Sequence, residues 1–339
     1  MKAIIPVAGA GARLRPLTYT QPKPLIPVGG KPIMSIIVDD LLAVGVQDFV
    51  FVIGYLGEKI KAYVESTYPQ LKKSFVTQEH RLGSAHALWT AREHIKDAEE
   101  LIIFFGDTVV DVDLQQIMGS PFSTLGVQKV KDPWEYGVVE YDLDPDKKDV
   151  VTRVTEKPKI PRSNMAMVGF YKIREVSDFL EALDFNINNN IRTKGEFPLT
   201  DALMRMIEQG IDFRTLQVNS WYNCGKKDVL LEANSILLDR EGFASSDLPP
   251  YDNSIIIPPV SIGKNCRIKN SIIGPHVTIG DNARLDNTIL KESIIGNYAA
   301  LKDVVLQKSV IGNDTSITGS RQSLNIGDNT EIDFSLPSS

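Results

Sequence analysis

Apolar and polar positions alternate along the first 238 residues in a way that separates short buried strands from amphipathic helices. Apolar runs such as Phe49–Ile53 fit strands that are covered on both faces, and the spacing of apolar residues after Pro32 fits a helix. Such strands alternating with helices are typical of a parallel sheet with helices on both faces. The pattern predicts an α/β domain over residues 1–238 with a mostly parallel, doubly wound sheet.

The expected elements of this domain can be placed along the chain. The expected strands are Ala3–Ala8, Phe49–Ile53, Ser74–Gln78, Leu101–Phe105, Leu125–Val130, Gly137–Tyr141, Val151–Thr155, Ala166–Ile173 and Phe213–Val218. The expected helices begin at Pro32 and cover Glu58–Tyr68, Ser84–His94, Glu175–Leu183, Leu199–Gln209 and Lys227–Leu238. The strict alternation loosens after Gly106-Asp107, where β-rich segments follow one another.

The C-terminal part of the chain has a different, repetitive pattern. Residues 239–254 contain Gly242, Ser245, Ser246, Pro249 and Pro250 and are expected to form a linker. Beyond Ile255 an aliphatic residue precedes a turn glycine again and again, at spacings of 17, 16, 16 and 15 residues. These glycines are Gly263, Gly280, Gly296, Gly312 and Gly327. Such a hexapeptide-repeat pattern predicts a β-helix of stacked coils over residues 255–335.

Composition and charge narrow the function classes. The formal net charge of -6, with both signs mixed along the chain, argues against a basic nucleic-acid-binding face. The two cysteines, Cys224 and Cys266, suggest neither a disulfide framework nor a metal-ligand spacing. The apolar run at the start of the chain, Met1 to Ala8, is too short for the apolar core of a signal peptide. No apolar stretch is long enough to span a membrane. A soluble, cytoplasmic protein is expected.

A glycine-rich turn follows the first expected strand and carries the strongest chemical signal. Gly9 and Gly11 allow a tight turn, and the cations Arg13 and Lys23 follow close behind. Free backbone N–H groups in such a turn can surround phosphate oxygens, and an arginine can add two parallel, charge-assisted hydrogen bonds. The segment therefore predicts a phosphate-binding loop.

Two other phosphate-binding loops fit this segment less well. A dinucleotide-binding loop would need a third glycine where Leu14 stands, and a helix should begin at once. Pro16, Pro22 and Pro24 keep the chain irregular instead. A P-loop is excluded because no Gly-Lys-Ser or Gly-Lys-Thr follows at the required spacing. A plain surface turn remains the alternative, although it leaves the combination of Gly, Arg and Lys unexplained.

Polar residues also follow two other expected strands, at the sheet edge where ligands collect. The Gln78 amide can both donate to and accept from a pyrimidine edge, although a solvated loop glutamine is an equal alternative. Asp107 stands at the tip of a buried strand, where one carboxylate and nucleotide phosphates could hold Mg²⁺, or where it could cap a helix. His80 and His86 are expected to be structural, because no second ligand lies at a metal-binding spacing.

Together these motifs resemble the signature of the nucleoside-diphosphate-sugar pyrophosphorylases. Over residues 1–238 the chain is similar to glucose-1-phosphate thymidylyltransferases and to their uridylyl- and guanylyltransferase relatives. The resemblance implies that Arg13 holds the departing pyrophosphate, that Lys23 neutralises the α-phosphate and that Asp107 binds Mg²⁺. It also implies a set of nucleotide-binding residues, namely Ala8, Gly9, Ala10, Gly11 and Ala12 around the triphosphate and Gln78 and Gly83 at the base.

The same resemblance implies a sugar-phosphate site and a second metal ligand. The residues implied at the sugar phosphate are Tyr136, Gly137, Glu156, Lys157 and Val168, with Lys157 on the phosphate. The metal ligand that most relatives supply as aspartate is Asn223 here. An amide oxygen can still bind Mg²⁺, as the N-acetylglucosamine-1-phosphate uridylyltransferases of the family suggest.

The expected activity is nucleotidyl transfer from dTTP or UTP to a sugar 1-phosphate, with glucose 1-phosphate as the sugar suggested by similarity. Mannose-1-phosphate guanylyl transfer and N-acetylglucosamine-1-phosphate uridylyl transfer are alternatives, and so is a non-catalytic regulatory subunit. A dinucleotide-dependent oxidoreductase is disfavoured, because this chain lacks the third glycine of the dinucleotide-binding loop. The β-helix, left-handed in the family, is expected to serve homo-oligomer assembly or regulation; acetyl transfer would need a catalytic histidine, for which His276 is the candidate in the tail.

Overall fold

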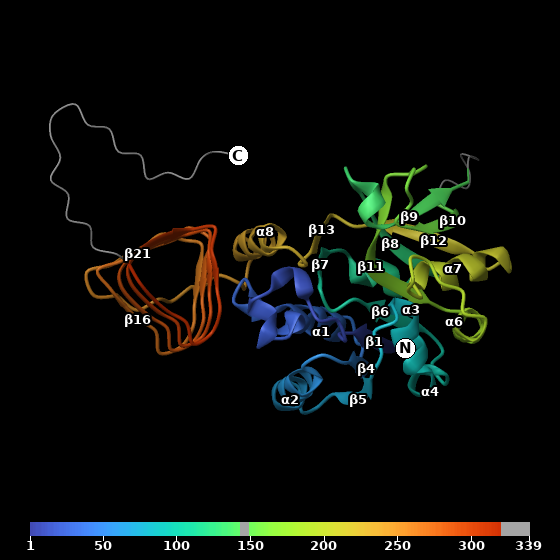
Figure 1. Cartoon of the computed structure of the whole chain (residues 1–339), viewed down its shortest axis with the longest axis horizontal. Helices are drawn as coiled ribbons and strands as arrows, with labels where there is room; N and C mark the ends of the chain where they lie inside the picture. Colours follow the sequence, from blue (N-terminus) through green and yellow to red (C-terminus); the bar gives the residue numbers. More distant parts are fainter. Residues whose placement is uncertain (143–148, 320–339) are drawn as a thin grey trace.

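The computed structural model describes residues 1–142 and 149–319, which form two adjoining parts. An α/β domain occupies the N-terminal part, and a stack of parallel coils follows it along the chain (Figure 1). Helix α8, at Lys227–Leu238, lies between the two.

Parallel strands form the N-terminal half of the central sheet. In spatial order they are β6 (Leu101–Phe104), β1 (Lys2–Pro6), β4 (Asp48–Ile53) and β5 (Lys72–Thr77). The side chains of β6, β1 and β4 are largely apolar on both faces, and Ile5 points into one hydrophobic core and Ile4 into the other; β5, at the edge, is only partly buried. This double burial is what the continuous apolar runs of the sequence predict.

Mostly antiparallel pairing completes the sheet on the other side of β6, with β12 parallel to β8. The strand next to it is β11 (Met165–Ile173), which is antiparallel to β6. The remaining strands are β8 (Ser123–Lys129), β9 (Gly137–Tyr141), β10 (Val151–Glu156) and β12 (Phe213–Gln217). Strand β11 shifts register between Met167 and Tyr171, and it pairs with β8 and β9 as well as β6. The sheet is therefore mixed, with its parallel strands concentrated in the N-terminal half.

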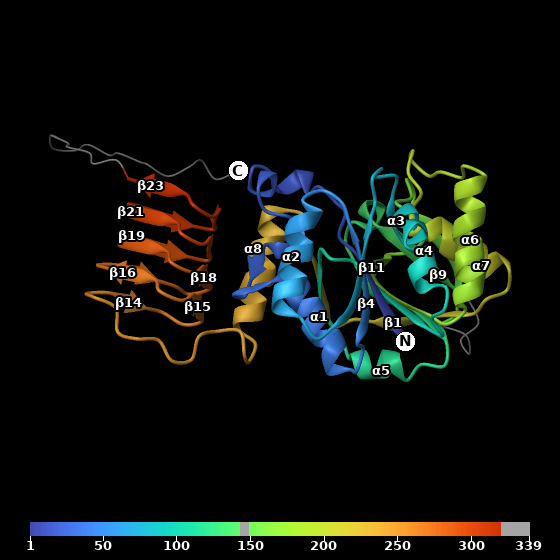
Figure 2. The same ribbon diagram turned by 90° about the horizontal axis from the view of Figure 1, so that it is seen from below.

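Helices cover both faces of the sheet, which confirms the doubly wound α/β fold. One face carries α1 (Ile33–Ala43), α2 (Gly57–Thr67), α5 (Leu114–Met118) and α8. The other carries α3 (Ser84–Thr90), α4 (Arg92–Ile95), α6 (Val176–Asn188) and α7 (Leu199–Glu208). Figure 2 shows these two helical layers on either side of the strands. The helix expected at Ser84–His94 is interrupted at Ala91, so that it forms α3 and α4.

A short ribbon that the sequence pattern does not reveal lies beside the sheet. Strand β7 (Thr108–Asp111) pairs antiparallel with β13 (Ser220–Asn223), and Asn223 lies opposite Thr108. The ribbon begins directly after Asp107, whose carbonyl oxygen accepts a hydrogen bond from the Cys224 N–H at 3.0 Å. It thereby joins the end of β6 to the segment before α8.

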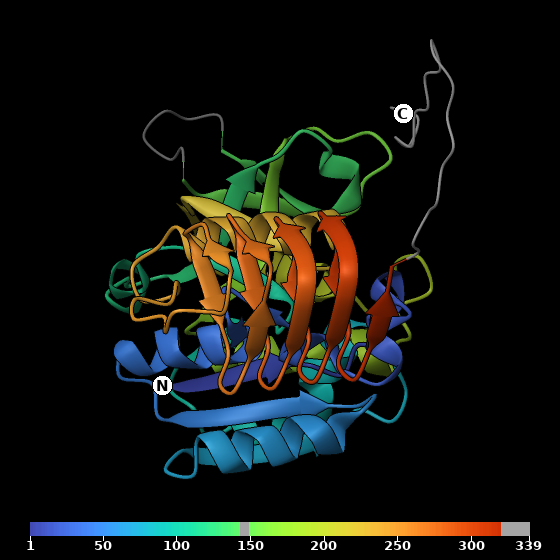
Figure 3. The same cartoon turned by 90° about the vertical axis from the view of Figure 1, so that its left-hand side faces the viewer.

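The C-terminal part is a β-helix, as the repeat predicts. Each coil pairs in parallel with the next, so that like residues stack; one such row is Ile262, Ile279, Ile295 and Ile311. Its strands are β14 (Ile255–Ile256), β15 (Val260–Ile262), β16 (Arg267–Lys269), β17 (Ile272–Ile273), β18 (Val277–Ile279), β19 (Arg284–Lys291), β20 (Ile294–Ile295), β21 (Ala300–Gln307), β22 (Val310–Ile311) and β23 (Ser316–Thr318). Figure 3 views the coils side by side. The last expected repeat, at Gly327, lies outside the described residues.

A single buried asparagine, Asn234, connects α8, the turn at Gly29 and the β-helix. The Asn234 side-chain oxygen accepts hydrogen bonds from the Gly29 N–H at 2.9 Å and from the Thr278 hydroxyl at 2.7 Å. Its amide nitrogen donates to the His276 carbonyl oxygen at 3.3 Å. The His276 ring in turn lies 3.1 Å from Asp239, so this histidine takes part in the junction between the domains.

The segment 239–254 follows the surface of the first coils, where the Ser245 N–H donates to the Val260 carbonyl oxygen. Both cysteines are free thiols. Among the helices of the described residues, none is long and apolar enough to cross a bilayer.

Asn234→Ala should destabilise the protein because it leaves buried hydrogen-bonding groups without partners. We expect a loss of about 2 to 4 kcal/mol and a melting temperature lower by about 5 °C or more. Glu232→Ala, at an exposed position of the same helix, is the control and should change stability by less than about 0.5 kcal/mol. Equal melting temperatures for the two variants would contradict the role given to Asn234.

Candidate active site

The glycine-rich loop after β1 folds back on itself. Gly11 has φ 61°, a conformation that favours glycine, and a Cβ there would lie 2.9 Å from the Thr18 methyl carbon. The Thr18 hydroxyl donates to the Gly11 carbonyl oxygen at 2.8 Å and closes the turn. Prolines restrict the chain that follows to one-turn 3₁₀ helices, Ala12–Leu14, Leu17–Tyr19 and Lys23–Leu25. The loop therefore leaves backbone N–H groups exposed, whereas a continuous helix would have paired them in helical hydrogen bonds.

A close approach between β1 and β6 brings Asp107 to this loop. A Cβ on Gly106 would lie 2.2 Å from a Val7 methyl carbon, so only glycine fits between the strands. The next residue, Asp107, accepts a hydrogen bond from the Lys23 ammonium, and Nζ and Oδ2 lie 2.7 Å apart. The Lys23 side chain is 9% exposed, so its charge is paired where little water reaches it.

The charge pair fixes the ionisation of Asp107. Burial acts to raise the pKa of this carboxyl group, but the Lys23 charge and the hydrogen bonds from Lys23 and Thr108 outweigh that effect. The pKa of Asp107 consequently lies below its ordinary value. The residue is a carboxylate at neutral pH.

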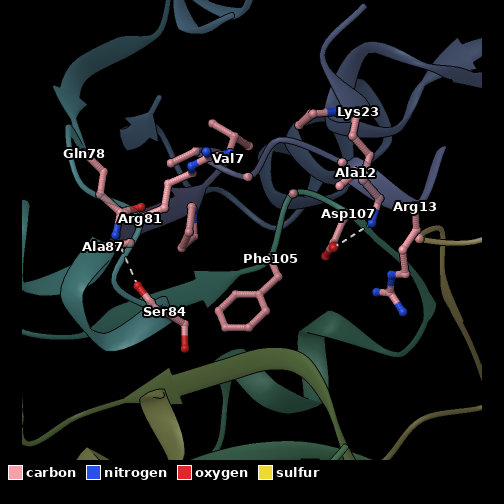
Figure 4. Close-up of a pocket in the computed structure, with 18 of the residues that line it drawn as sticks. Val7, Ala12, Arg13, Lys23, Gln78, Arg81, Ser84, Ala87, Phe105 and Asp107 are labelled. Carbon is pink, nitrogen blue, oxygen red and sulfur yellow. Dashed lines mark hydrogen bonds and ion pairs between the residues drawn. The ribbon is translucent and has the colours of Figure 1, made fainter. Parts of the chain in front are cut away.

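The first cavity, of about 390 Å³, lies over the glycine-rich loop. The expected nucleotide-site and catalytic residues that line it are Ala8, Gly9, Gly11, Ala12, Arg13, Lys23, Gln78, Gly83 and Asp107. Ala10 belongs to the same expected set but does not line the cavity. Figure 4 shows Gln78 at one end of the cavity and Lys23, Asp107 and Arg13 at the other.

The second cavity, of about 500 Å³, adjoins the first. The expected sugar-site and metal residues that line it are Tyr136, Gly137, Glu156, Lys157, Val168 and Asn223. Arg13 and Asp107 line both cavities. The structure thus brings together residues from distant parts of the α/β domain around two cavities, and Arg13 and Asp107 are among the side chains that the cavities share.

Glu156 is held in place at the end of β10. Its Oε2 accepts a hydrogen bond from the Thr200 hydroxyl at 3.2 Å, and its Oε1 lies 3.3 Å from the Lys157 ammonium. Across from it, Gly137 packs so closely that a Cβ would lie 2.8 Å from the Thr200 methyl carbon. A carboxylate, an ammonium and accessible backbone are groups suited to a sugar phosphate.

The β7–β13 ribbon places Asn223 beside the segment that carries Asp107. The Asn223 side-chain oxygen is buried and has no hydrogen-bond partner in the described structure. A Cβ on Gly225 would lie 3.1 Å from this oxygen and 2.9 Å from the Arg13 guanidinium. A buried oxygen without a partner beside a carboxylate fits a hard cation such as Mg²⁺. No cluster of three His, Cys, Asp or Glu side chains suited to a metal occurs among the described residues, so phosphate oxygens and water would complete the shell.

Some residues of the two cavities give no clear signal in the sequence. Ser84, Phe105 and Glu196 line both cavities, and Arg81 lines the first. The Lys194 ammonium donates to the Lys157 carbonyl oxygen at 2.7 Å. Lys194 and Glu196 come from the irregular stretch between α6 and α7, where no hydrophobic pattern marks a position.

Comparison with known proteins decides the family. Residues 2–240 match the nucleotidyl transferase family. The chain belongs to this family. The match covers the α/β domain and ends just after α8, before the β-helix.

Curated relatives of this nucleotidyltransferase have different names. The low-salt glycan biosynthesis nucleotidyltransferase Agl11 of Haloferax volcanii is 30% identical over 261 residues, covering 73% of this chain and 70% of that protein. The bifunctional protein GlmU of Methanocaldococcus jannaschii is 33% identical, covering 71% of this chain and 55% of GlmU. A glucose-1-phosphate thymidylyltransferase of Streptomyces antibioticus is 27% identical, covering 79% and 74%. The alignment thus spans about half of the length of GlmU.

Solved structures confirm the fold of the nucleotidyltransferase domain. A UDP-glucose pyrophosphorylase complexed with UDP-glucose matches with a TM-score of 0.61 at 22% identity, over 69% of this chain and 97% of that one. The family and the relatives together support sugar-phosphate nucleotidyl transfer, without deciding the substrate.

Gly83→Ala should damage both folding and nucleotide binding. Gly83 has φ 114°, and a Cβ would lie 2.4 Å from the Phe197 carbonyl oxygen. We expect a loss of about 2 to 4 kcal/mol of stability and, because Gly83 lines the first cavity, a rise in the KM for nucleotide of about tenfold or more.

The matched control is Gly45→Ala, which also has a positive φ, 89°, but open space around the new methyl group. It should cost about 1 to 2 kcal/mol and leave the KM unchanged. Urea unfolding and initial-rate kinetics measure both quantities. Equal KM values for the two variants would contradict the steric role of Gly83.

Proposed function

We propose that the protein transfers the nucleotidyl group of dTTP or UTP to a sugar 1-phosphate, giving a nucleoside-diphosphate sugar and pyrophosphate. The observation that carries the proposal is the pair of adjoining cavities that share Arg13 and Asp107, with Lys23 bound to Asp107. The first cavity takes the nucleotide and the second takes the sugar phosphate. The reaction occurs where they meet.

The proposed reaction is a direct displacement. A phosphate oxygen of the sugar 1-phosphate attacks the α-phosphorus, and the bond to the β-phosphate breaks as pyrophosphate leaves. Because the attacking oxygen is already anionic, no general base is needed, and the protein aligns two polyanions and neutralises their charge. Arg13 holds the departing pyrophosphate, Lys23 neutralises the α-phosphate, and Glu156 binds sugar hydroxyls.

A covalent route through the nearest thiol is disfavoured. Cys224 is completely buried, and this burial raises the pKa of its thiol to about 12. It therefore carries no thiolate at neutral pH, which supports attack by the sugar phosphate itself.

Asp107 and Asn223 are the residues that would hold Mg²⁺. A bound Mg²⁺ supplies positive charge next to the phosphates. Because Lys23 contacts only Oδ2 of Asp107, the other carboxylate oxygen, Oδ1, would be available to the metal while the Lys23 ammonium faces the α-phosphate. The same lysine would thus lie between the Asp107 carboxylate and the substrate phosphate and neutralise both.

Two features bear on the choice of substrates. Gln78 suits a pyrimidine, and thymine and uracil differ by one methyl group, worth about 1 kcal/mol of discrimination, so both are expected to react. Glucose 1-phosphate follows from similarity to the thymidylyltransferases. N-acetylglucosamine 1-phosphate is the second candidate, because Asn223 stands where most relatives have aspartate and because GlmU proteins are among the relatives.

We also propose that the chain forms a homo-oligomer through the β-helix or the catalytic domain. An exposed aliphatic row supports the first of these surfaces. Ile255, Ile272, Ile289 and Val305 stack in register on consecutive coils and are 60%, 36%, 43% and 73% exposed. Aligned apolar side chains of this kind favour contact with another chain.

The proposed activity predicts the outcome of a substrate matrix. We expect pyrophosphate release from dTTP and UTP in the presence of Mg²⁺ and a sugar 1-phosphate, with kcat/KM at least about tenfold above that for ATP or GTP. Glucose 1-phosphate and N-acetylglucosamine 1-phosphate decide between the two sugars, and mannose 1-phosphate with GTP tests the guanylyl alternative. No pyrophosphate release from any combination would favour the non-catalytic regulatory subunit.

Asn223→Ala should weaken metal binding. We expect the Mg²⁺ concentration for half-maximal activity to rise about tenfold or more, because one of two protein ligands is lost. Asn219→Ala, four residues earlier on the exposed turn before β13, is the control and should leave the titration unchanged. Superimposable Mg²⁺ titrations for Asn223→Ala and the unmodified protein would remove Asn223 from the metal site.

A further inference from the structure

Gln78 is fixed at the end of the first cavity that lies away from the phosphate-binding residues (Figure 4). Its backbone N–H donates to the Ile53 carbonyl oxygen at 2.8 Å, and the residue is 5% exposed. Its side-chain nitrogen donates to the Gly83 carbonyl oxygen at 3.1 Å and lies 3.0 Å from His86 Nδ1. The amide nitrogen therefore has a partner for each of its two hydrogens.

The Gly83 carbonyl oxygen decides which way the amide points. A carbonyl oxygen can only accept, so the NH₂ end of Gln78 must face it; the reversed amide would bring two oxygens together. The second N–H then points at His86 Nδ1, which must offer a lone pair. His86 is therefore neutral, with its proton on Nε2.

The surroundings of His86 agree with a neutral ring. Burial lowers the pKa of His86, and the nearby charges of His80 and Arg192 lower it further. The ring lies next to Phe197 and Trp89, with centroids 6.5 Å and 5.8 Å away. His86 lies on α3 and is not among the residues that line the cavity.

The oxygen of Gln78 remains available to a ligand. In the described structure Gln78 Oε1 has no hydrogen-bond partner, and yet it is not among the fully buried unpaired atoms. A glutamine amide in isolation could either donate or accept. Here both hydrogens are used by the protein, so the cavity presents an acceptor.

We propose that His86 is a positioning residue for base recognition: by accepting from Gln78, it leaves only the Gln78 oxygen to meet the base. The inference rests on the proposed nucleotide site. An acceptor at this place selects a base with an N–H donor at ring N3, which uracil and thymine have. In cytosine, ring N3 is itself an acceptor, so N3 and the Gln78 oxygen would face each other as two acceptors and repel.

UTP and CTP are the matched probes, because they share ribose and triphosphate and differ only at this edge of the base. The readout is kcat/KM for each nucleotide, from pyrophosphate release with a saturating sugar 1-phosphate. The unmodified enzyme should prefer UTP over CTP by about 100-fold or more. Comparable use of CTP and UTP would overturn the orientation assigned to Gln78. Absence of pyrophosphate release with any nucleotide would instead overturn the proposed function itself.

His86→Phe keeps an aromatic ring beside Phe197 and removes the acceptor. It should lower the UTP/CTP preference about tenfold through the KM for UTP, with kcat changed less than about twofold. His86→Asn, whose side-chain oxygen can accept in place of Nδ1, should keep the preference within about threefold of the unmodified enzyme. His86→Leu is a second variant without an acceptor, should the phenylalanine variant fail to fold. An asparagine variant as impaired as these two would show that His86 acts through packing alone.

A double-mutant cycle tests whether His86 acts through Gln78. In a Gln78→Ala background there is no amide to orient, so His86→Phe should change the preference less than about twofold. A tenfold effect that persists in this background would overturn the proposal. A loss of the effect would support it.

Discussion

The ion pair between Lys23 and Asp107 is the contact on which the arrangement of the site depends. It joins the glycine-rich loop to the end of β6, and the two residues are 84 positions apart in the chain. A lysine side chain with so little exposure needs a counter-charge, because an unpaired ammonium there would lose its hydration without compensation. The same pair holds a cation and an anion where the two cavities meet. In the proposed reaction, substrate phosphates and a divalent cation would bring the opposite charges, so that Lys23 and Asp107 could each contact a ligand.

The mixed sheet places one cavity on each side of this pair, and in the proposed reaction each cavity takes one substrate. The parallel strands β1, β4 and β5 end near the glycine-rich loop and Gln78, as expected for ligands at the carboxyl edge of a parallel sheet. The antiparallel strands β9, β10 and β11 supply the groups of the second cavity, including Gly137 and Glu156. Asp107 lies where the two halves meet, in the turn between β6 and β7. The β-helix is fastened behind this domain, against α8, and its junction at Asn234 also reaches the segment after Lys23.

Much of the fold could be predicted because burial on two faces leaves a strong pattern. The strand at Gly137–Tyr141 and the helix at Lys227–Leu238 have the boundaries that the sequence suggests, and the repeat of turn glycines predicts the β-helix. The β7–β13 ribbon could not be predicted, because its two short strands are distant in sequence and only partly buried as a pair. The break at Ala91 is equally invisible, since apolar spacing continues across it.

In the candidate site, too, some features could be predicted from the sequence and others could not. The motifs predicted which residues would gather around the phosphates, and all of that set except Ala10 line one of the two cavities. What the motifs could not give is orientation. From the sequence, His86 is expected to be structural and Gln78 to act as either donor or acceptor. In the structure, the hydrogen bonds to Gly83 and His86 use both hydrogens of the Gln78 amide and leave its oxygen as an acceptor. Such detail depends on contacts between a strand end, a loop and a helix, and no local pattern encodes it.

The central claim is that the protein aligns and neutralises two polyanions so that one attacks the other directly. The stereochemistry at the α-phosphorus tests this claim, with a nucleotide made chiral there by a single sulfur substitution. One direct displacement predicts inversion of configuration in the nucleoside-diphosphate sugar. Retention would require two displacements and a nucleotidylated residue, with the Asp107 carboxylate the first to be suspected, and it would contradict the account.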